Sequence, residues 1–304
     1  MKKVAIVILE YSGTKDTIEC LKSINDVFVN DFALLTIVVD NASEKKFKID
    51  NFKFTNGDLK IIRNEKNLGF SGGNNVGISY ALENEATHVV ILNNDTIVDV
   101  DFINQLLHVA DSRENIGIVA PKIYFEKGFE YHKDRYKKED LGKIIWYAGG
   151  VMDWENALGF HKGVDKVDRG DFGNIETTEF ASGCCMMVKR EVFEKIGVFD
   201  EKYFLYYEDN DFCQKAKNLG YKILFVPDSV TWHKNAGSSG GSGSNLQDYY
   251  ITRNRMLFGM RYAPIRTKIA LIKESIIILL KGRDFQKKGI IDFYLRKFGK
   301  GSYK

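Results

Sequence analysis

The sequence is poor in several residues and patterns that mark common classes of protein. In 304 residues it has only three prolines and four cysteines, and it has no apolar run of about 18 residues that could span a membrane. The cysteines show neither zinc nor redox spacing, so we expect all of them to be buried and reduced: Cys20, Cys184, Cys185 and Cys213. The apolar start at 4–9 meets Glu10 without a small-residue cleavage site, which indicates the first strand of a cytosolic protein and not a signal peptide.

The net charge of +3 hides an uneven distribution. Residues 261–304 hold twelve Lys or Arg and three Asp or Glu, a local charge of +9, which leaves −6 for residues 1–260. A nucleic-acid-binding protein gathers its basic residues on the recognition face, so an acidic body with a basic tail argues against a nucleic-acid partner. A basic tail suits an anionic lipid surface.

The stretch 88–98 contains the clearest single pattern. Its apolar run Val89–Leu92 ends abruptly on Asn93, Asn94 and Asp95. A short β-branched run between polar residues predicts a buried central strand, and open α/β sheets bind ligands at the carboxyl ends of such strands. One carboxylate flanked by amides can hold Mg²⁺ or Mn²⁺, which often take one or two protein oxygens plus waters and phosphates. The alternative is a plain polar turn.

Further apolar strands are predicted at 4–9, 35–39 and 59–62, with amphipathic helices between them. This alternation over the first 120 residues predicts an α/β fold with a mostly parallel, Rossmann-like central sheet flanked by helices. Tyr11 and Asp40 follow two of these strands, as Asn94 and Asp95 follow the central one. A nucleotide at this edge would find a ring to stack on, a carboxylate for a base N–H and a metal ligand for its phosphates.

A glycine-rich segment, 67–77, leads into one of these helices. It lacks the G-x-G-x-x-G spacing of dinucleotide-binding proteins and the Lys-Ser/Thr pair of a P-loop. A glycine-rich helix entry can still bring backbone N–H groups close to a phosphate or sugar. A flexible turn is the alternative.

The second half of the chain offers acids beside aromatic residues. After an irregular region at 121–180 with short strands, the pattern predicts a strand at 180–188 and a helix that follows the sequence Tyr-Tyr-Glu-Asp-Asn-Asp at 206–211. Acids in a first helical turn complement the helix dipole. However, apolar surroundings raise the pKa of a carboxyl and make it a competent general base, so Glu208 and Asp209 are candidate catalytic residues.

The segments that follow suggest a lid and a surface-binding tail. Residues 235–245 are rich in glycine and serine and could pass for an engineered linker, but between a strand and a helix they fit a mobile lid over bound substrate. The tail at 264–298 interleaves Ile, Leu and Phe with Lys and Arg, which predicts basic amphipathic helices on a membrane surface. The alternatives are a helical hairpin packed on the catalytic domain and a homodimer interface.

Together these segments resemble the inverting family-2 glycosyltransferases of the GT-A fold, in the rhamnosyltransferase-like branch. The resemblance covers most of the chain, from residue 4 to about 258, and rests on seven blocks in the right order: 11–13, 39–43, 67–75, 92–95, 207–209, His233 and 249–255. It implies a GT-A catalytic domain at 1–258, with a nucleotide-sugar-binding half at 1–120 and an acceptor-binding half at 121–258. Residues 259–304 would form the helical tail.

The resemblance also implies roles by position. Asp209 would be the general base, with its neighbour Glu208 as the alternative, and Asp95 and His233 would ligate Mg²⁺ or Mn²⁺ at the donor diphosphate. Tyr11 and Asp40 would hold the nucleotide base. Other donor contacts would come from Asn41, Asn67, Gly69, Asn74, Asn94 and, at the leaving diphosphate, Arg253 or Arg255.

The implied activity is transfer of one sugar from a nucleoside-diphosphate sugar, of dTDP-rhamnose or UDP-hexose type, to a hydroxyl of a glycan or lipid-linked acceptor in cell-surface polysaccharide synthesis. The Gln-x-x-Arg-Trp motif of processive synthases is absent. The resemblance is imperfect at Glu10 and Ser12, where the family usually has Asn. The metal motif has one acid, Asp95, where many relatives have two or three. The rival functions are a sugar-1-phosphate nucleotidyltransferase and a non-catalytic nucleotide- or glycan-binding module. The enzyme would work in the cytoplasm, or at the inner face of the plasma membrane.

Overall fold

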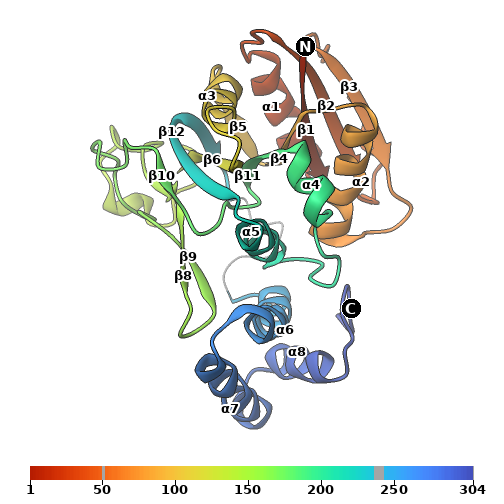
Figure 1. Ribbon diagram of the computed structural model, residues 1–304, viewed down its shortest axis with the longest axis vertical. Helices are drawn as coiled ribbons and strands as arrows, with labels where there is room; N and C mark the ends of the chain where they lie inside the picture. The colour runs from red at the N-terminus through yellow and green to blue at the C-terminus, as the bar shows by residue number, and fades with distance from the viewer. Residues whose placement is uncertain (50–51, 236–242, 304) are drawn as a thin grey trace.

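The computed structural model describes residues 1–49, 52–235 and 243–303 and shows an α/β fold (Figure 1). Its strands are β1 (Lys2–Glu10), β2 (Phe32–Asp40), β3 (Asp58–Arg63), β4 (His88–Asn93), β5 (Thr96–Val98), β6 (Ile116–Phe125), β7 (Ile145–Tyr147), β8 (Gly150–Asp153), β9 (Leu158–His161), β10 (Glu176–Thr177), β11 (Cys185–Lys189) and β12 (Lys222–His233). Its α-helices are α1 (Thr14–Asn25), α2 (Gly69–Glu83), α3 (Phe102–Ala110), α4 (Arg190–Ile196), α5 (Glu208–Asn218), α6 (Asn245–Tyr262), α7 (Ile265–Lys281) and α8 (Asp284–Tyr294).

The central sheet has the strand order β10-β12-β6-β11-β4-β1-β2-β3, with β5 paired to β12 and β7 paired to β6. Strands β3, β2, β1 and β4 run parallel to one another, as β6 and β12 do. Between these two groups lies β11, antiparallel to both β4 and β6. The predicted fold class, a central sheet flanked by helices with further helices at the C-terminus, is therefore confirmed.

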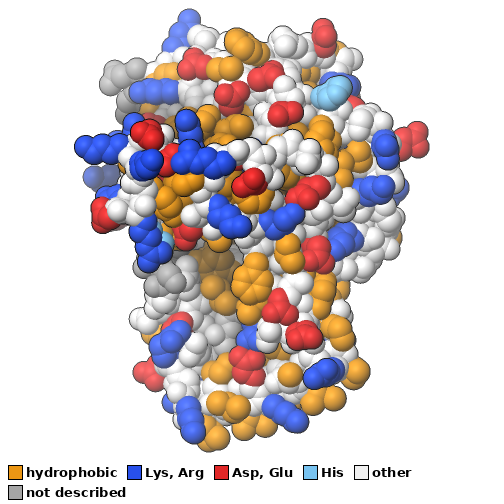
Figure 2. All heavy atoms as spheres, turned by 90° about the vertical axis from the view of Figure 1, so that its left-hand side faces the viewer, with side chains coloured by type: hydrophobic (Ala, Val, Ile, Leu, Met, Phe, Trp, Pro, Cys, Tyr) orange, Lys and Arg blue, Asp and Glu red, His pale blue; other side chains and the backbone are white. Residues whose placement is uncertain are grey.

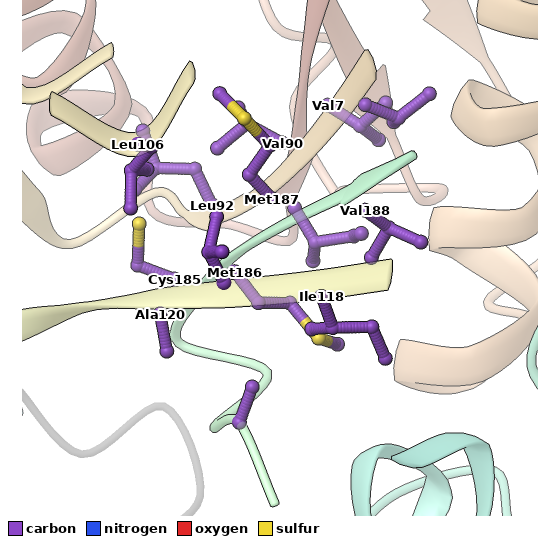
Figure 3. Packing of buried hydrophobic residues seen from close by; sticks show 14 of the residues in the cluster. Val7, Val90, Leu92, Leu106, Ile118, Ala120, Cys185, Met186, Met187 and Val188 are labelled. Atoms are coloured by element: carbon purple, nitrogen blue, oxygen red, sulfur yellow. The ribbon is translucent and has the colours of Figure 1, made fainter. Parts of the chain in front are cut away.

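The core forms where the central strands carry apolar side chains on both faces. Figure 3 shows Val90 and Leu92 of β4 packed beside Cys185 and Met187 of β11. All four cysteines are free and buried, as predicted. Because both faces of these strands are covered, the runs read as continuously apolar instead of alternating.

The glycine-rich segment allows helix α2 to lie close against β1. A Cβ at Gly73 would come within 2.4 Å of Leu9, and a Cβ at Gly77 within 2.3 Å of Val7. At the start of the helix, Gly69 has φ +73°, a conformation that glycine adopts without strain. The glycines thus serve close packing and a tight turn at the predicted donor edge.

Helices α6, α7 and α8 form a layer of their own below α5 in Figure 1. Helix α6 crosses residue 258, so the catalytic domain and the tail predicted on either side of that residue share one helix. Within the parts of the chain that the structure describes, no helix is long and apolar enough to cross a membrane. Residues 236–242 of the predicted lid lie outside the described residues.

Candidate active site

Side chains at the carboxyl ends of β1 and β4 bind one another. The carboxylate of Glu10 accepts hydrogen bonds from the Gly13 amide at 2.9 Å and the Asn94 amide nitrogen at 3.1 Å, and it also bonds Thr17. Burial raises the pKa of Glu10, although these donors work in the opposite direction. Asn94 therefore ties the end of β4 to the start of α1. Tyr11 stands at the same edge and is 49% exposed, and its stacking with a nucleotide base stays a prediction.

Asp40, at the end of β2, is fully buried and its two oxygens are already bonded. They accept from the amides of Ser43 at 2.9 Å and Phe47 at 3.0 Å and pair with Arg63. Burial opposes its ionisation, but the hydrogen bonds from Phe47, Ser43 and Arg63 prevail, so the pKa of Asp40 is lowered. In this arrangement Asp40 fixes the loop after β2, and its contact with a nucleotide base stays a prediction.

The loop before α2 is held by a network of amide side chains. The Asn41 amide nitrogen donates to the Asn67 side chain at 3.0 Å and to the Gly69 carbonyl at 3.1 Å. Its oxygen accepts from Asn64 at 3.0 Å. Asn74, one turn into the helix, is buried and donates to the backbone of α2. The predicted donor residues of this segment thus lie together and shape the loop; whether they also contact the donor stays a prediction.

Asp95 and His233 come together although 137 residues separate them in the sequence. Strand β5 follows Asp95 directly and pairs with the end of β12, which places Nε2 of His233 3.1 Å from Oδ1 of Asp95. The ring of Trp146 packs edge-on against His233, with centroids 4.6 Å apart, and against His161 at 4.4 Å. Burial lowers the pKa of His161 to about 4, so this second imidazole is neutral near pH 7.

Lys234 fixes the end of β12 beside this pair. Its amide donates to the carbonyl of Asp95 at 2.9 Å, while its ammonium group bonds Asp16 at 2.8 Å and also Glu19, both in α1. The lysine side chain is only 5% exposed. It anchors the strand that carries His233 to the helix that follows β1.

The two candidate bases at the start of α5 have different surroundings. Asp209 is partly exposed and accepts from the amides of Gly183 at 3.0 Å and Asn210 at 2.8 Å. Burial raises its pKa despite those bonds. Glu208 is buried, and among the described residues one of its carboxyl oxygens has no hydrogen-bond partner. Burial, together with the charge of Asp209, raises the pKa of Glu208 well above the usual range.

The segment Ser182–Cys184 bonds both the candidate base Asp209 and the end of β4, which precedes Asp95. The amide of Gly183 donates a hydrogen bond to Asp209, and the carbonyl of Cys184 accepts one from the amide of Asn93 at 2.8 Å. The predicted strand at 180–188 is correspondingly shorter, with β11 beginning only at Cys185. One short turn thus connects Asp209 to Asn93 at the end of β4, two residues before Asp95.

A turn in an unusual backbone conformation precedes Asp209, and α6 holds it. Phe204, Tyr206 and Tyr207 have φ of 66°, 68° and 74°, values that bulky side chains avoid. From α6, the Asn254 amide nitrogen lies 2.8–2.9 Å from the carbonyls of Tyr203, Leu205 and Tyr206.

The two arginines predicted to bind the diphosphate are engaged elsewhere. Arg253 is fully buried, and its guanidinium bonds the carbonyls of Tyr203 at 2.9 Å and Gly299 at 2.7 Å. Arg255 forms a two-point ion pair with Glu274 at 2.7 and 3.0 Å. Both therefore connect α6 to its neighbours, and their diphosphate contact stays a prediction.

The family model described as "Glycosyl transferase family 2" matches residues 6–197, more than half of the chain. The chain belongs to this family. The glycosyltransferase is 28% identical over 256 residues to a hexosyltransferase of low-salt glycan biosynthesis, Agl10, from Haloferax volcanii, covering 83% of this chain and 74% of that one. It is 25% identical to the dTDP-rhamnosyl transferase RfbF of Shigella flexneri, covering 84% and 83% of the two chains.

Solved structures show the same fold. The glycosyltransferase superposes on GalNAc-T7, solved with UDP, GalNAc and Mn²⁺, with a TM-score of 0.60 over 97% of this chain and 58% of that one, at 18% identity. It superposes on the mannosyltransferase PcManGT of Pyrobaculum calidifontis, solved with GDP-mannose and Mn²⁺, with a TM-score of 0.52 over 91% and 70% of the chains, at 17% identity.

Several residues that shape the site of this glycosyltransferase have no readable signal in the sequence. Trp146 and Lys234 act through tertiary contacts, and Gly183 lies inside an apolar run. Asn254 falls within the matched block 249–255, but a sequence cannot reveal that its side-chain amide contacts three backbone carbonyls of the turn before Asp209.

Proposed function

We propose that this glycosyltransferase moves one sugar from a nucleoside-diphosphate donor to an acceptor hydroxyl with inversion at the anomeric carbon, and that it depends on a divalent cation. The observation that carries the proposal is that one turn, 182–184, bonds both Asp209 and Asn93, two residues before Asp95, which in turn pairs with His233. A binding module without turnover has no need of a base beside a metal pair.

Asp209 supports the role of base better than Glu208. It is partly exposed, so an acceptor hydroxyl can reach it, and its raised pKa makes it a stronger base than a free aspartate. Glu208 is turned into the protein, where burial favours its neutral form. In the proposed step Asp209 takes the hydroxyl proton, and the acceptor oxygen attacks the anomeric carbon opposite the departing diphosphate. The bond to the diphosphate breaks and its electron pair leaves with the diphosphate.

Asp95 and His233 fit the cation. Two ligand atoms that each lie about 2.1 Å from an octahedral ion, at a right angle to each other, are about 3.0 Å apart. Nε2 of His233 and Oδ1 of Asp95 are separated by 3.1 Å. Among the described residues no group of three His, Cys, Asp or Glu side chains could hold a metal. The other ligands would therefore be waters and donor phosphates, which suits Mg²⁺ or Mn²⁺. Bound there, the ion supplies positive charge that stabilises the departing diphosphate.

The donor and acceptor classes follow from the relatives. The names of two relatives specify dTDP-rhamnosyl and hexosyl transfer, which supports dTDP-rhamnose or a nucleotide-linked hexose as donor. We keep the UDP-hexose type as the second candidate, since one protein of the same fold was solved with UDP. A rhamnosyltransferase acting on a decaprenol-linked sugar in Mycobacterium tuberculosis is 39% identical over 59 residues. This supports a lipid-linked or glycan acceptor. We place the reaction in the cytoplasm. The domain halves at 1–120 and 121–258 remain part of this proposal.

The test pairs nucleotide binding with turnover. Nucleoside diphosphates and their sugars are screened by thermal shift with and without Mn²⁺, since ligands of the native state raise its melting temperature. Asp95→Ala should remove the Mn²⁺-dependent part of the shift given by dTDP or UDP. Asp209→Asn should keep that shift and lose sugar transfer by at least about a hundredfold. Glu155→Gln, at an exposed acid between β8 and β9, is the matched control.

The outcomes separate the rival functions. With the nucleotide sugar that the screen identifies as donor, proton NMR of the product should show the anomeric configuration opposite to that of the donor. If no nucleotide shifts the melting temperature, the donor site is wrong. A retained shift with undiminished transfer in Asp209→Asn would remove the base from the proposal.

A further inference from the structure

The outer side of helix α7 carries a continuous row of exposed apolar side chains. Ile265, Ile269, Ile272, Ile276 and Leu280 follow one another at helical spacing and are between 41% and 74% exposed. This spacing places them along a single face of the helix. Globular proteins rarely leave such a contiguous apolar row in water without a function.

The opposite side of α7 already fulfils the structural task of the helix. Leu271 is 2% exposed in a small core shared with α6 and α8, and Ser275 is fully buried. Thr267 donates to the carbonyl of Trp154 at 2.8 Å, which fixes the start of the helix to the β8–β9 hairpin. The outer row is therefore not required for packing within the described chain.

Charge decides which partner this row fits. Residues 261–304 carry a local charge of +9. Of their three acids, Glu274 is paired with Arg255, and Asp292 is 2% exposed and bonded to Ser302. Two of their twelve basic residues, Arg261 and Arg283, are paired with Asp200 and Asp248 of the body, and the charge stays positive without them. Figure 2 shows apolar side chains along the lower end of the molecule, where Figure 1 places α7 and α8, with basic and some acidic side chains among them. A second copy would bring like charge against like charge, whereas an anionic lipid surface complements it.

We propose that the outer face of α7, defined by Ile265, Ile269, Ile272, Ile276 and Leu280, is a docking surface for an anionic membrane. The helix lies in the plane of the interface, with these side chains among the lipid head groups and acyl chains and the neighbouring lysines and arginines at the phosphates. The surface is more specific than the sequence pattern at 264–298, because Ile290 of α8 is fully buried and does not belong to it.

The experiment measures co-sedimentation of the full chain with vesicles. One set is phosphatidylcholine alone, and the other contains an equal amount of phosphatidylglycerol. The native protein should bind the anionic vesicles, and binding should weaken as salt rises, because the attraction is screened. The double variant Ile272→Glu with Ile276→Glu should bind at least about tenfold more weakly.

A matched control carries the same substitution elsewhere. Ile175→Glu changes an isoleucine that is 51% exposed before β10, outside the tail, and should bind vesicles as the native chain does. All variants should keep the native melting temperature and its shift with nucleotide, so failure here is distinct from failure of the proposed chemistry.

Three results would overturn the proposal. These are no binding of the native chain to anionic vesicles, equal binding by the double variant, and a native dimer in light scattering that the double variant converts to a monomer. The last would assign the row to a second copy of the chain.

Discussion

Replacing Asn254 by leucine tests whether helix α6 holds the turn that leads to Asp209. Asn254 is fully buried, its amide nitrogen contacts the carbonyls of Tyr203, Leu205 and Tyr206, and its oxygen accepts from Arg253 at 3.0 Å. An amide has two N–H bonds, so it makes two full hydrogen bonds to the three carbonyls and accepts a third bond from Arg253.

Leucine removes all three bonds and leaves their partners buried. Each unsatisfied partner costs about 1 kcal/mol at the lower end of measured values, so the free energy of unfolding should fall by about 3 kcal/mol. At roughly 2 °C per kcal/mol for a chain of this size, the melting temperature should drop by about 6 °C. Asn84→Leu, which removes a single bond of 2.8 Å to Tyr80 at the end of α2, is the control and should cost far less.

The same change should separate turnover from donor binding. Left-handed φ values cost about 1–3 kcal/mol each and persist only where surrounding contacts impose them, so the turn at 204–207 should relax when Asn254 is lost. The maximal rate of sugar transfer should fall at least about tenfold, with the nucleotide thermal shift retained. The reasoning is refuted if Asn254→Leu melts within a degree of the native protein, or if nucleotide binding is lost in proportion to turnover.

Two further predictions concern Glu208 and Trp146. The native state keeps the proton of Glu208 above pH 4.5, where the unfolded chain loses it, so stability falls as pH rises from 4.5 through the raised pKa. Glu208→Gln should therefore melt higher than the native protein at pH 8, with a difference that shrinks toward pH 4.5; a difference independent of pH would contradict this. Trp146→Ala removes the ring that packs against His233 and should weaken Mn²⁺ binding about tenfold, as measured by electron paramagnetic resonance. Trp154→Ala, a tryptophan packed on Phe258, should leave it unchanged, and equal effects would refute a specific role of Trp146.

The sequence predicts the parallel half of the sheet well because its signal there is local. The strands expected at 4–9, 35–39 and 89–92 lie within β1, β2 and β4, since each is an apolar run bounded by polar residues. The run at 180–188 misleads for the same reason. Its first residues are apolar, yet the Gly183 amide is bonded by Asp209 and cannot join a strand ladder.

The site is less accessible to sequence reasoning because it is assembled from distant segments. The pairing of Asp95 with His233 depends on β5 meeting β12, which only the resemblance to a family indicated. The role of Arg253 depends on what surrounds it. The resemblance implies that Arg253 binds an anion; the structure adds that its guanidinium bonds backbone carbonyls from two other segments, and the diphosphate contact stays a prediction.

The bonds of Arg253 have a practical consequence for work with this protein. Its guanidinium joins Tyr203, in the turn before the proposed base, to Gly299, near the end of the chain. Shortening the chain before residue 299 to improve solubility would strip a buried cation of one of its partners and disturb the turn. Loss of activity after such a truncation would therefore not show that the enzyme requires a membrane, and point substitutions on the outer face of α7 are the cleaner tool.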